Sequence, residues 1–194
     1  MMLGSARRAA CATLVLLSAA ATTPIARADM SMFSKYWDNV AIAAANNDAA
    51  TVRSLVTGGN PVNQTDEEGR TGLAVAAING NLQIAAILMK AGANLNYKDR
   101  LGNTPMHYAA ERNQIEMAQL LLDVGAAVDP ENKNGMTPLM LAASRGNIAI
   151  VQALLAKGAD ARKGDFTGRD AVSWAADSHR PNVIQALQRA ATKH

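Results

Sequence analysis

The stretch Gly102–Ala110, GNTPMHYAA, returns 33 residues later as GMTPLMLAA at Gly135–Ala143. The segments GRTGLAVAA, which begins at Gly69, and GRDAVSWAA, which begins at Gly168, keep the same register. Two further sets of residues recur with this period: Gly59, Gly92, Gly125 and Gly158, and Leu55, Leu88, Leu121, Leu154 and Leu187. A fixed period shared by several columns indicates an internal repeat, in which each unit is one supersecondary structure.

Each copy predicts a helix that begins just after its threonine position. The hydroxyl of Thr104 or Thr137 can accept a hydrogen bond from the free amides of a first helical turn. Pro105 and Pro138 follow at the first helical position, where a missing N–H costs nothing. The paired alanines near the end of this helix allow a neighbouring helix to approach closely.

A second helix follows in each copy. Gly146-Asn147 interrupts the first helix, and Ile148, Val151 and Leu154 then recur at helical spacing as an apolar stripe. A glycine able to adopt positive φ ends the second helix, and these glycines are Gly92, Gly125 and Gly158. Helices of under about a dozen residues are marginal alone in water, so the stability must come from stacking one copy on the next.

The segments GNTPMHYAA and GMTPLMLAA, together with LLLDVGAAV and LLAKGAD, resemble ankyrin repeats over about residues 36–190. The resemblance implies an all-α solenoid of about five 33-residue helix–turn–helix units with β-turn fingers. We expect one domain at residues 36–194, with units at approximately 36–65, 66–98, 99–131, 132–164 and 165–194. The first and last units depart from the pattern and are expected to be caps with polar outer faces. In the first unit, Asp38 can cap the first helix.

One of the three histidines, His107, occupies the histidine position of the ankyrin signature. The resemblance implies that its ring packs at the root of the turn and bonds neighbouring backbone groups. A catalytic histidine would need a nucleophile and an orienting acid, but Thr104 is assigned to capping and Ser144 approaches only if adjacent repeats align on one face. The scattered histidines form no zinc pattern, and the glycines form no phosphate-binding loop. We therefore expect no catalytic residue, no metal and no cofactor.

The first 28 residues are typical of a secretory signal peptide. The pair Arg7-Arg8 precedes an uncharged run at Ala9–Ala21, and Ala26-Arg27-Ala28 supplies small residues for a cleavage site. We expect cleavage after Ala28, a flexible lead at residues 29–35 and a periplasmic protein, exported by either the general or the twin-arginine route. The alternative is an uncleaved membrane anchor, although the apolar run is shorter than the roughly 20 residues of a membrane span.

Cleavage would change the charge and the cysteine content of the chain. It would remove Cys11, the single cysteine, and with it any disulfide or thiol chemistry. It would also remove Arg7, Arg8 and Arg27 from the 19 Lys+Arg, which leaves 16 against 16 Asp+Glu and lowers the net charge from +3 to zero. Nucleic-acid binding needs a basic surplus on one face, so we expect no nucleic-acid partner.

Repeat stacks usually bind partners with their turn tips and first helices, and that resemblance selects candidate residues here. Leu101, Met136 and Phe166 are large apolar residues at tips that we expect to be exposed, and aromatic and arginine side chains are favoured anchors of interfaces. Basic residues dominate the C-terminal half, so we expect a groove that prefers an acidic partner segment there. The candidate partner-binding residues are Glu67, Glu68, Arg70, Arg100, Leu101, Arg112, Lys133, Met136, Arg145, Phe166 and Arg169.

These expectations favour a non-enzymatic protein-binding module that acts as a monomer in the periplasm. A stress-protective role, or immunity-type binding of an exported enzyme, is compatible with this interpretation. One alternative is a membrane-tethered scaffold with an uncleaved N-terminal segment. Another is a hydrolytic enzyme with a site in the groove, which would require a converging triad or metal cluster that the sequence does not contain.

Overall fold

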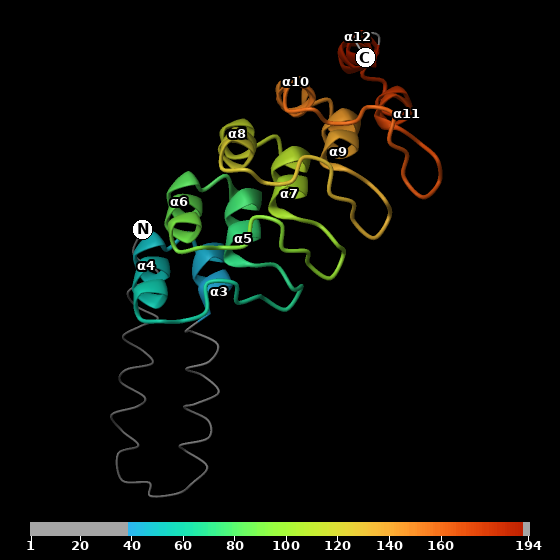
Figure 1. Cartoon of the computed structure of the whole chain (residues 1–194). Helices are drawn as coiled ribbons and strands as arrows, with labels where there is room; N and C mark the ends of the chain where they lie inside the picture. The colour runs from blue at the N-terminus through green and yellow to red at the C-terminus, as the bar shows by residue number, and fades with distance from the viewer. Residues whose placement is uncertain (1–38, 192–194) are drawn as a thin grey trace, which may run out of the picture. The chain divides into compact units, whose positions relative to one another are not determined.

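The computed structural model describes residues 39–191, which fold into ten helices labelled α3 to α12 (Figure 1). The five first helices are α3 (Val40–Ala45), α5 (Gly72–Asn79), α7 (Pro105–Glu111), α9 (Pro138–Arg145) and α11 (Ala171–Asp177). The five second helices are α4 (Ala49–Thr57), α6 (Leu82–Lys90), α8 (Ile115–Asp123), α10 (Ile148–Ala156) and α12 (Pro181–Ala191). Within residues 39–191 no strand forms, and the one isolated bridge pairs Thr65 with Thr71.

The helices form two rows. Each second helix packs on the first helix of its own pair, and α3, α5, α7, α9 and α11 pack side by side in chain order. The second helices make the other row, in which α4 contacts α6 and α10 contacts both α8 and α12 (Figure 1). This arrangement confirms the expected all-α stack of helix pairs. The predicted signal peptide and flexible lead lie outside the described residues.

The first helices begin where capping chemistry predicts. The hydroxyl oxygens of Thr71 and Thr137 accept from backbone amides three residues later, and Asp170 caps α11 in the same way. Helix α3 differs in its capping residue. The side chain of Asn39 accepts hydrogen bonds from the amides of the two residues that follow Val40, at distances of 2.7 and 3.3 Å. Asp38, which the repeat alignment suggested as the cap, lies outside the described residues, and α3 begins one residue later than that alignment implies, with Asn39 in the N-cap position.

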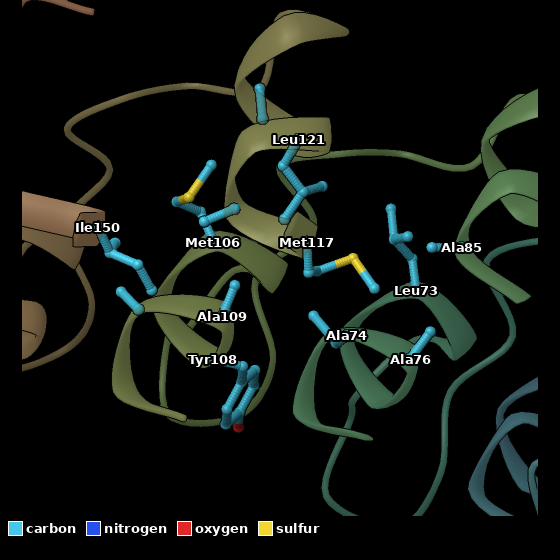
Figure 2. Close-up of a cluster of buried hydrophobic side chains, with 14 of the residues drawn as sticks. Leu73, Ala74, Ala76, Ala85, Met106, Tyr108, Ala109, Met117, Leu121 and Ile150 are labelled. Atoms are coloured by element: carbon cyan, nitrogen blue, oxygen red, sulfur yellow. The ribbon is translucent and has the colours of Figure 1, made fainter. Parts of the chain in front are cut away.

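The core lies between the two rows and between successive pairs. Leu73, Met106, Met117 and Leu121 are at most 1% exposed, and Figure 2 shows Met117 reaching from α8 toward Leu73 of α5. The alanine pairs of α3, α5, α7 and α9 are also buried, which lets these helices approach closely, whereas in α11 Ala175 is buried and Ala176 is exposed. Burying a side chain of this size stabilises the fold by roughly 1.5–3 kcal/mol relative to leaving it exposed, so every repeat depends on its neighbours.

Glycines close the second helices, as Gly92, Gly125 and Gly158 have φ angles of 82°, 89° and 87°. No helix among the described residues is both long and apolar enough to cross a lipid bilayer.

Candidate protein-binding surface

Four five-residue fingers join consecutive helix pairs, at residues 66–70, 99–103, 132–136 and 165–169. The first residue of each finger organises it. In the second finger, Asp99 Oδ1 accepts from the amides of Leu101 and Asn103 at 2.8 and 2.9 Å, and the Asp99 amide donates to the Asn103 carbonyl at 3.0 Å. The other fingers repeat these bonds, with these residues in first position: Asp66, Asn132 and Asp165.

This column of finger-organising residues is missing from the sequence-based expectations. However, Asp66, Asp99, Asn132 and Asp165 recur at the repeat period of 33 residues. The 33-residue period alone would therefore have been enough to identify these residues from the sequence. A side-chain oxygen that bonds backbone amides two and four residues later is a turn-forming device of Asp and Asn.

The fourth residue of each finger is a glycine with positive φ, and in the first three fingers the next finger also lies against it. Gly102 has φ of +80°, and a Cβ atom there would lie 2.7 Å from the backbone nitrogen of Lys133. At Gly135 a Cβ atom would lie 2.6 Å from the ring of Phe166. The ring of Phe166 therefore rests on the bare α-carbon of the preceding finger.

Backbone hydrogen bonds join each finger to the next. The amide of Arg100 donates to the carbonyl of Glu68 at 3.2 Å, and the amide of Lys133 donates to the carbonyl of Leu101 at 3.0 Å. The amide of Phe166 continues the series by donating to Asn134. Figure 1 shows the fingers projecting together from the row of first helices. We call the residues in second finger position the finger row: Glu67, Arg100, Lys133 and Phe166.

The exposed apolar residues lie at this surface. Phe166 is 73% exposed and Leu101 is 65% exposed, the largest values among the exposed large hydrophobic residues of the described chain. The expectation that Met136 would be exposed at a tip was wrong. It is half-buried against the core, because the fifth finger position turns inward and its carbonyl accepts from the ring of His107.

Half of the candidate cations already have carboxylate partners in the chain. Arg70 lies 2.8 Å from Asp66 and 3.0 Å from Glu68, and Arg145 lies 2.5 Å from Glu111 of the preceding repeat. Arg169 forms longer ion pairs, at 3.5–3.6 Å. The excess of basic residues expected in the C-terminal half is thus partly neutralised. Within residues 39–191, the candidates that form no ion pair are Arg100, Arg112 and Lys133, and all three are exposed.

Two aromatic side chains tie fingers to first helices. The hydroxyl of Tyr108 donates to Asp99. The pKa of Tyr108 is raised to about 12, mainly by burial and secondly by this hydrogen bond. The indole of Trp174 donates to Asp165 at 3.1 Å, and the guanidinium of Arg169 lies 3.8 Å from the centre of its ring. Burial alone would raise the pKa of Asp165, but the hydrogen bonds that it accepts lower it below its usual value.

His107 is fully buried, and both of its ring nitrogens are occupied. Nδ1 accepts from the amide of Thr104 at 3.0 Å, so Nε2 carries the proton and donates to the carbonyl of Met136 at 3.0 Å. Burial lowers the pKa of His107 to about 4. The hydroxyl of Ser144 donates to a backbone carbonyl of its own helix, so these two residues do not form a nucleophile–base pair. Among the described residues, no three His, Cys, Asp or Glu side chains converge as a metal site.

Comparison with known proteins agrees with this architecture. A family model described as ankyrin repeats (3 copies) matches residues 40–131 and 124–193, which cover nearly all of the described residues. No curated protein matches the sequence.

Proposed function

The chain belongs to the ankyrin-repeat family, whose stacked repeats indicate a protein–protein interaction module, and from this premise we propose that it captures one partner protein through the finger row and Leu101. The observation that carries the proposal is the combination of exposed apolar and cationic groups on stacked fingers. Phe166 and Leu101 present apolar surface, and Arg100 and Lys133 lie beside them as exposed cations. Aromatic and arginine side chains contribute most to protein interfaces.

The charge of this surface favours an acidic segment of the partner at the C-terminal part of the stack. Arg145 and Arg169 contribute less, because carboxylates of the chain already lie beside them. Arg112, at the C-terminal end of α7, is a further exposed cation that forms no ion pair within residues 39–191. Oppositely charged surfaces steer association and select partners more than they raise affinity, so the partner's acidic residues would set specificity and the apolar tips would provide the anchor.

The sequence of the N-terminal segment supports a periplasmic location for this binding. A positively charged start, a short apolar run and small residues before Asp29 are the features of a cleaved signal peptide. In that compartment the module would hold or shield an exported partner, as in a stress-protective or immunity-type role. A membrane-tethered scaffold is the second candidate, and it predicts that the N-terminal segment stays attached.

The proposal is tested by comparing capture by two triple variants. The first carries Arg100→Ala, Lys133→Ala and Phe166→Ala, which change only exposed finger residues. The matched control carries Arg53→Ala, Lys90→Ala and Val124→Ala, which change the same kinds of exposed residue on the second-helix side.

Proteins captured from the exported fraction by the parent chain are quantified by mass spectrometry for both variants. We expect the finger variant to capture at least about tenfold less partner than the parent chain, because it lacks side chains that anchor the interface. The control should capture as much partner as the parent. Equal capture by all three proteins, with unchanged circular dichroism, would reject the finger row as the binding surface.

A further inference from the structure

The hydrogen bonds of the fingers set a regular spacing along the finger row. Each finger contributes one backbone pairing within itself, from Asp99 to Asn103, and one to the next finger, from Lys133 to Leu101. Hydrogen-bonded extended backbones lie about 4.8 Å apart. Two such pairings per repeat place equivalent finger residues roughly 10 Å apart.

An extended peptide matches this spacing at every third residue. It advances about 3.3 Å per residue, so three residues span roughly 10 Å. Successive members of the finger row would therefore face residues i, i+3, i+6 and i+9 of an extended partner segment lying along the stack. A helical partner rises only about 1.5 Å per residue, and its side chains would meet neighbouring fingers at intervals of about seven residues.

The side chains of the finger row determine what the partner must offer at those positions. Glu67 is exposed and favours a basic residue, while Arg100 and Lys133 are exposed cations and favour acidic residues. Phe166 is held against Gly135 on one side and exposed on the other, so it offers a fixed apolar platform. Preorganised side chains lose little conformational freedom on binding.

We infer that the partner presents an extended ten-residue segment with a basic residue, two acidic residues and an apolar residue at successive third positions. This inference rests on the proposed function, because it describes the segment that the finger row would capture. The presence of both a basic and acidic residues distinguishes this ligand from a uniform polyanion. Nucleic acid or an anionic membrane would bring phosphate groups against Glu67 and Glu68 as well as against the cations.

The test uses the full chain and labelled peptides of about 16 residues in a Gly/Ser background, a length that spans the finger row. The reference peptide carries Lys, Glu, Glu and Leu at every third position. Two peptides of identical composition carry the same residues at every second or every fourth position, and both chain directions are made. Affinity is measured by fluorescence polarisation.

We expect the reference peptide to bind on the order of tenfold more tightly than either respaced peptide, since each misplaced exposed ion pair weakens binding by up to about fivefold. Lys133→Glu should weaken the reference peptide, and replacing the second Glu of the peptide by Lys should restore binding to that variant. A role of Lys133 in folding alone would not produce this rescue.

Every other outcome overturns the inference. The outcomes also show whether the proposed function fails with it. Equal affinity for all spacings, lost in the Arg100→Ala, Lys133→Ala, Phe166→Ala variant, would leave the finger row as a binding surface and reject the three-residue spacing. Absence of measurable peptide binding would also reject the three-residue spacing. The proposed function would then still be decided by the partner-capture experiment with the two triple variants. Tighter binding of duplex DNA or anionic vesicles than of the reference peptide would reject both.

Discussion

Replacing His107 by glutamine should weaken the fold at neutral pH and make it less sensitive to acid. The imidazole links two repeats, because Nδ1 accepts from the Thr104 amide and Nε2 donates to the carbonyl of Met136 in the next finger. Glutamine can keep an acceptor for the helix cap but cannot reproduce both bonds with the same ring geometry. We expect the substitution to lower the free energy of unfolding at neutral pH by about 1–3 kcal/mol.

The acid sensitivity of the parent chain follows from the lowered pKa of His107. Burial is the main cause, and Lys98 lowers the pKa further, while Asp99 and the carbonyl of Met136 partly oppose the shift. The folded chain holds the ring neutral down to about pH 4, whereas the unfolded chain takes up a proton near pH 6.5. The stabilising contribution of the neutral ring is therefore complete above about pH 6.5 and is lost as the pH falls toward 4. Over that interval the loss is about 3 kcal/mol, at roughly 1.4 kcal/mol per pH unit.

Urea unfolding of both proteins, followed by circular dichroism from about pH 7.5 to about pH 4, measures this difference. Carboxylates titrate in both proteins alike, so the difference between the two stability curves isolates His107. We expect the parent to be the more stable protein at neutral pH and to lose that advantage below about pH 5. Parallel curves over the whole range would show that the histidine is not held neutral by its burial, and the argument from its two hydrogen bonds would fail.

Three further results are expected. Gly102→Ala should destabilise the chain by at least about 1 kcal/mol more than Gly92→Ala. Both glycines have positive φ, but of the two only Gly102 would place a Cβ against the next finger. Equal losses of stability in urea titrations would contradict this. Tyr108→Phe should cost about 1–3 kcal/mol by removing the donor to the buried carboxylate of Asp99, and a change within error in the same titration would rule out that bond as a structural link. If the first segment is a cleaved signal peptide, as proposed, N-terminal sequencing of the protein should give Asp29 as the first residue, whereas an intact first segment would support the tethered alternative.

The helix pairs could be predicted from sequence because their causes are local. Pro105 and Pro138 begin α7 and α9, as expected from residues that suit a first helical turn. The repeat period then supplied the remaining pairs. The shifted start of α3 was missed because the first unit lacks Thr-Pro, so that the alignment alone could not separate Asp38 from Asn39 as the cap.

The candidate surface was harder to predict because its contacts cross repeats. Met136 was expected to be exposed. However, the ring of His107 in the preceding repeat donates a hydrogen bond to the backbone carbonyl of Met136, and the residue turns inward. Likewise, Arg145 is neutralised by Glu111, which lies 34 residues earlier in the chain. Residues separated by about one repeat become neighbours only when the units are stacked, so single-unit motifs do not reveal which charges stay available for a partner.

The finger row differs from the first and fourth finger positions in one informative respect. The physical demands of a stacked repeat recur with its period, so a position that the fold needs should hold similar residues in every unit. The first finger position holds only Asp or Asn and the fourth only Gly, whereas the second holds Glu67, Arg100, Lys133 and Phe166. Exposure without periodic similarity indicates that the fold requires no particular side chain there.

Charge reversal in the finger row should therefore change binding without changing stability. Arg100→Glu alters an exposed side chain whose backbone amide keeps its bond to Glu68, so we expect the free energy of unfolding to stay within about 0.5 kcal/mol of the parent value. Partner capture should fall in the same protein. A loss of stability well beyond that range in urea titration would show that the second finger position supports the stack, and its variety among the repeats would then need a structural cause instead of a functional one.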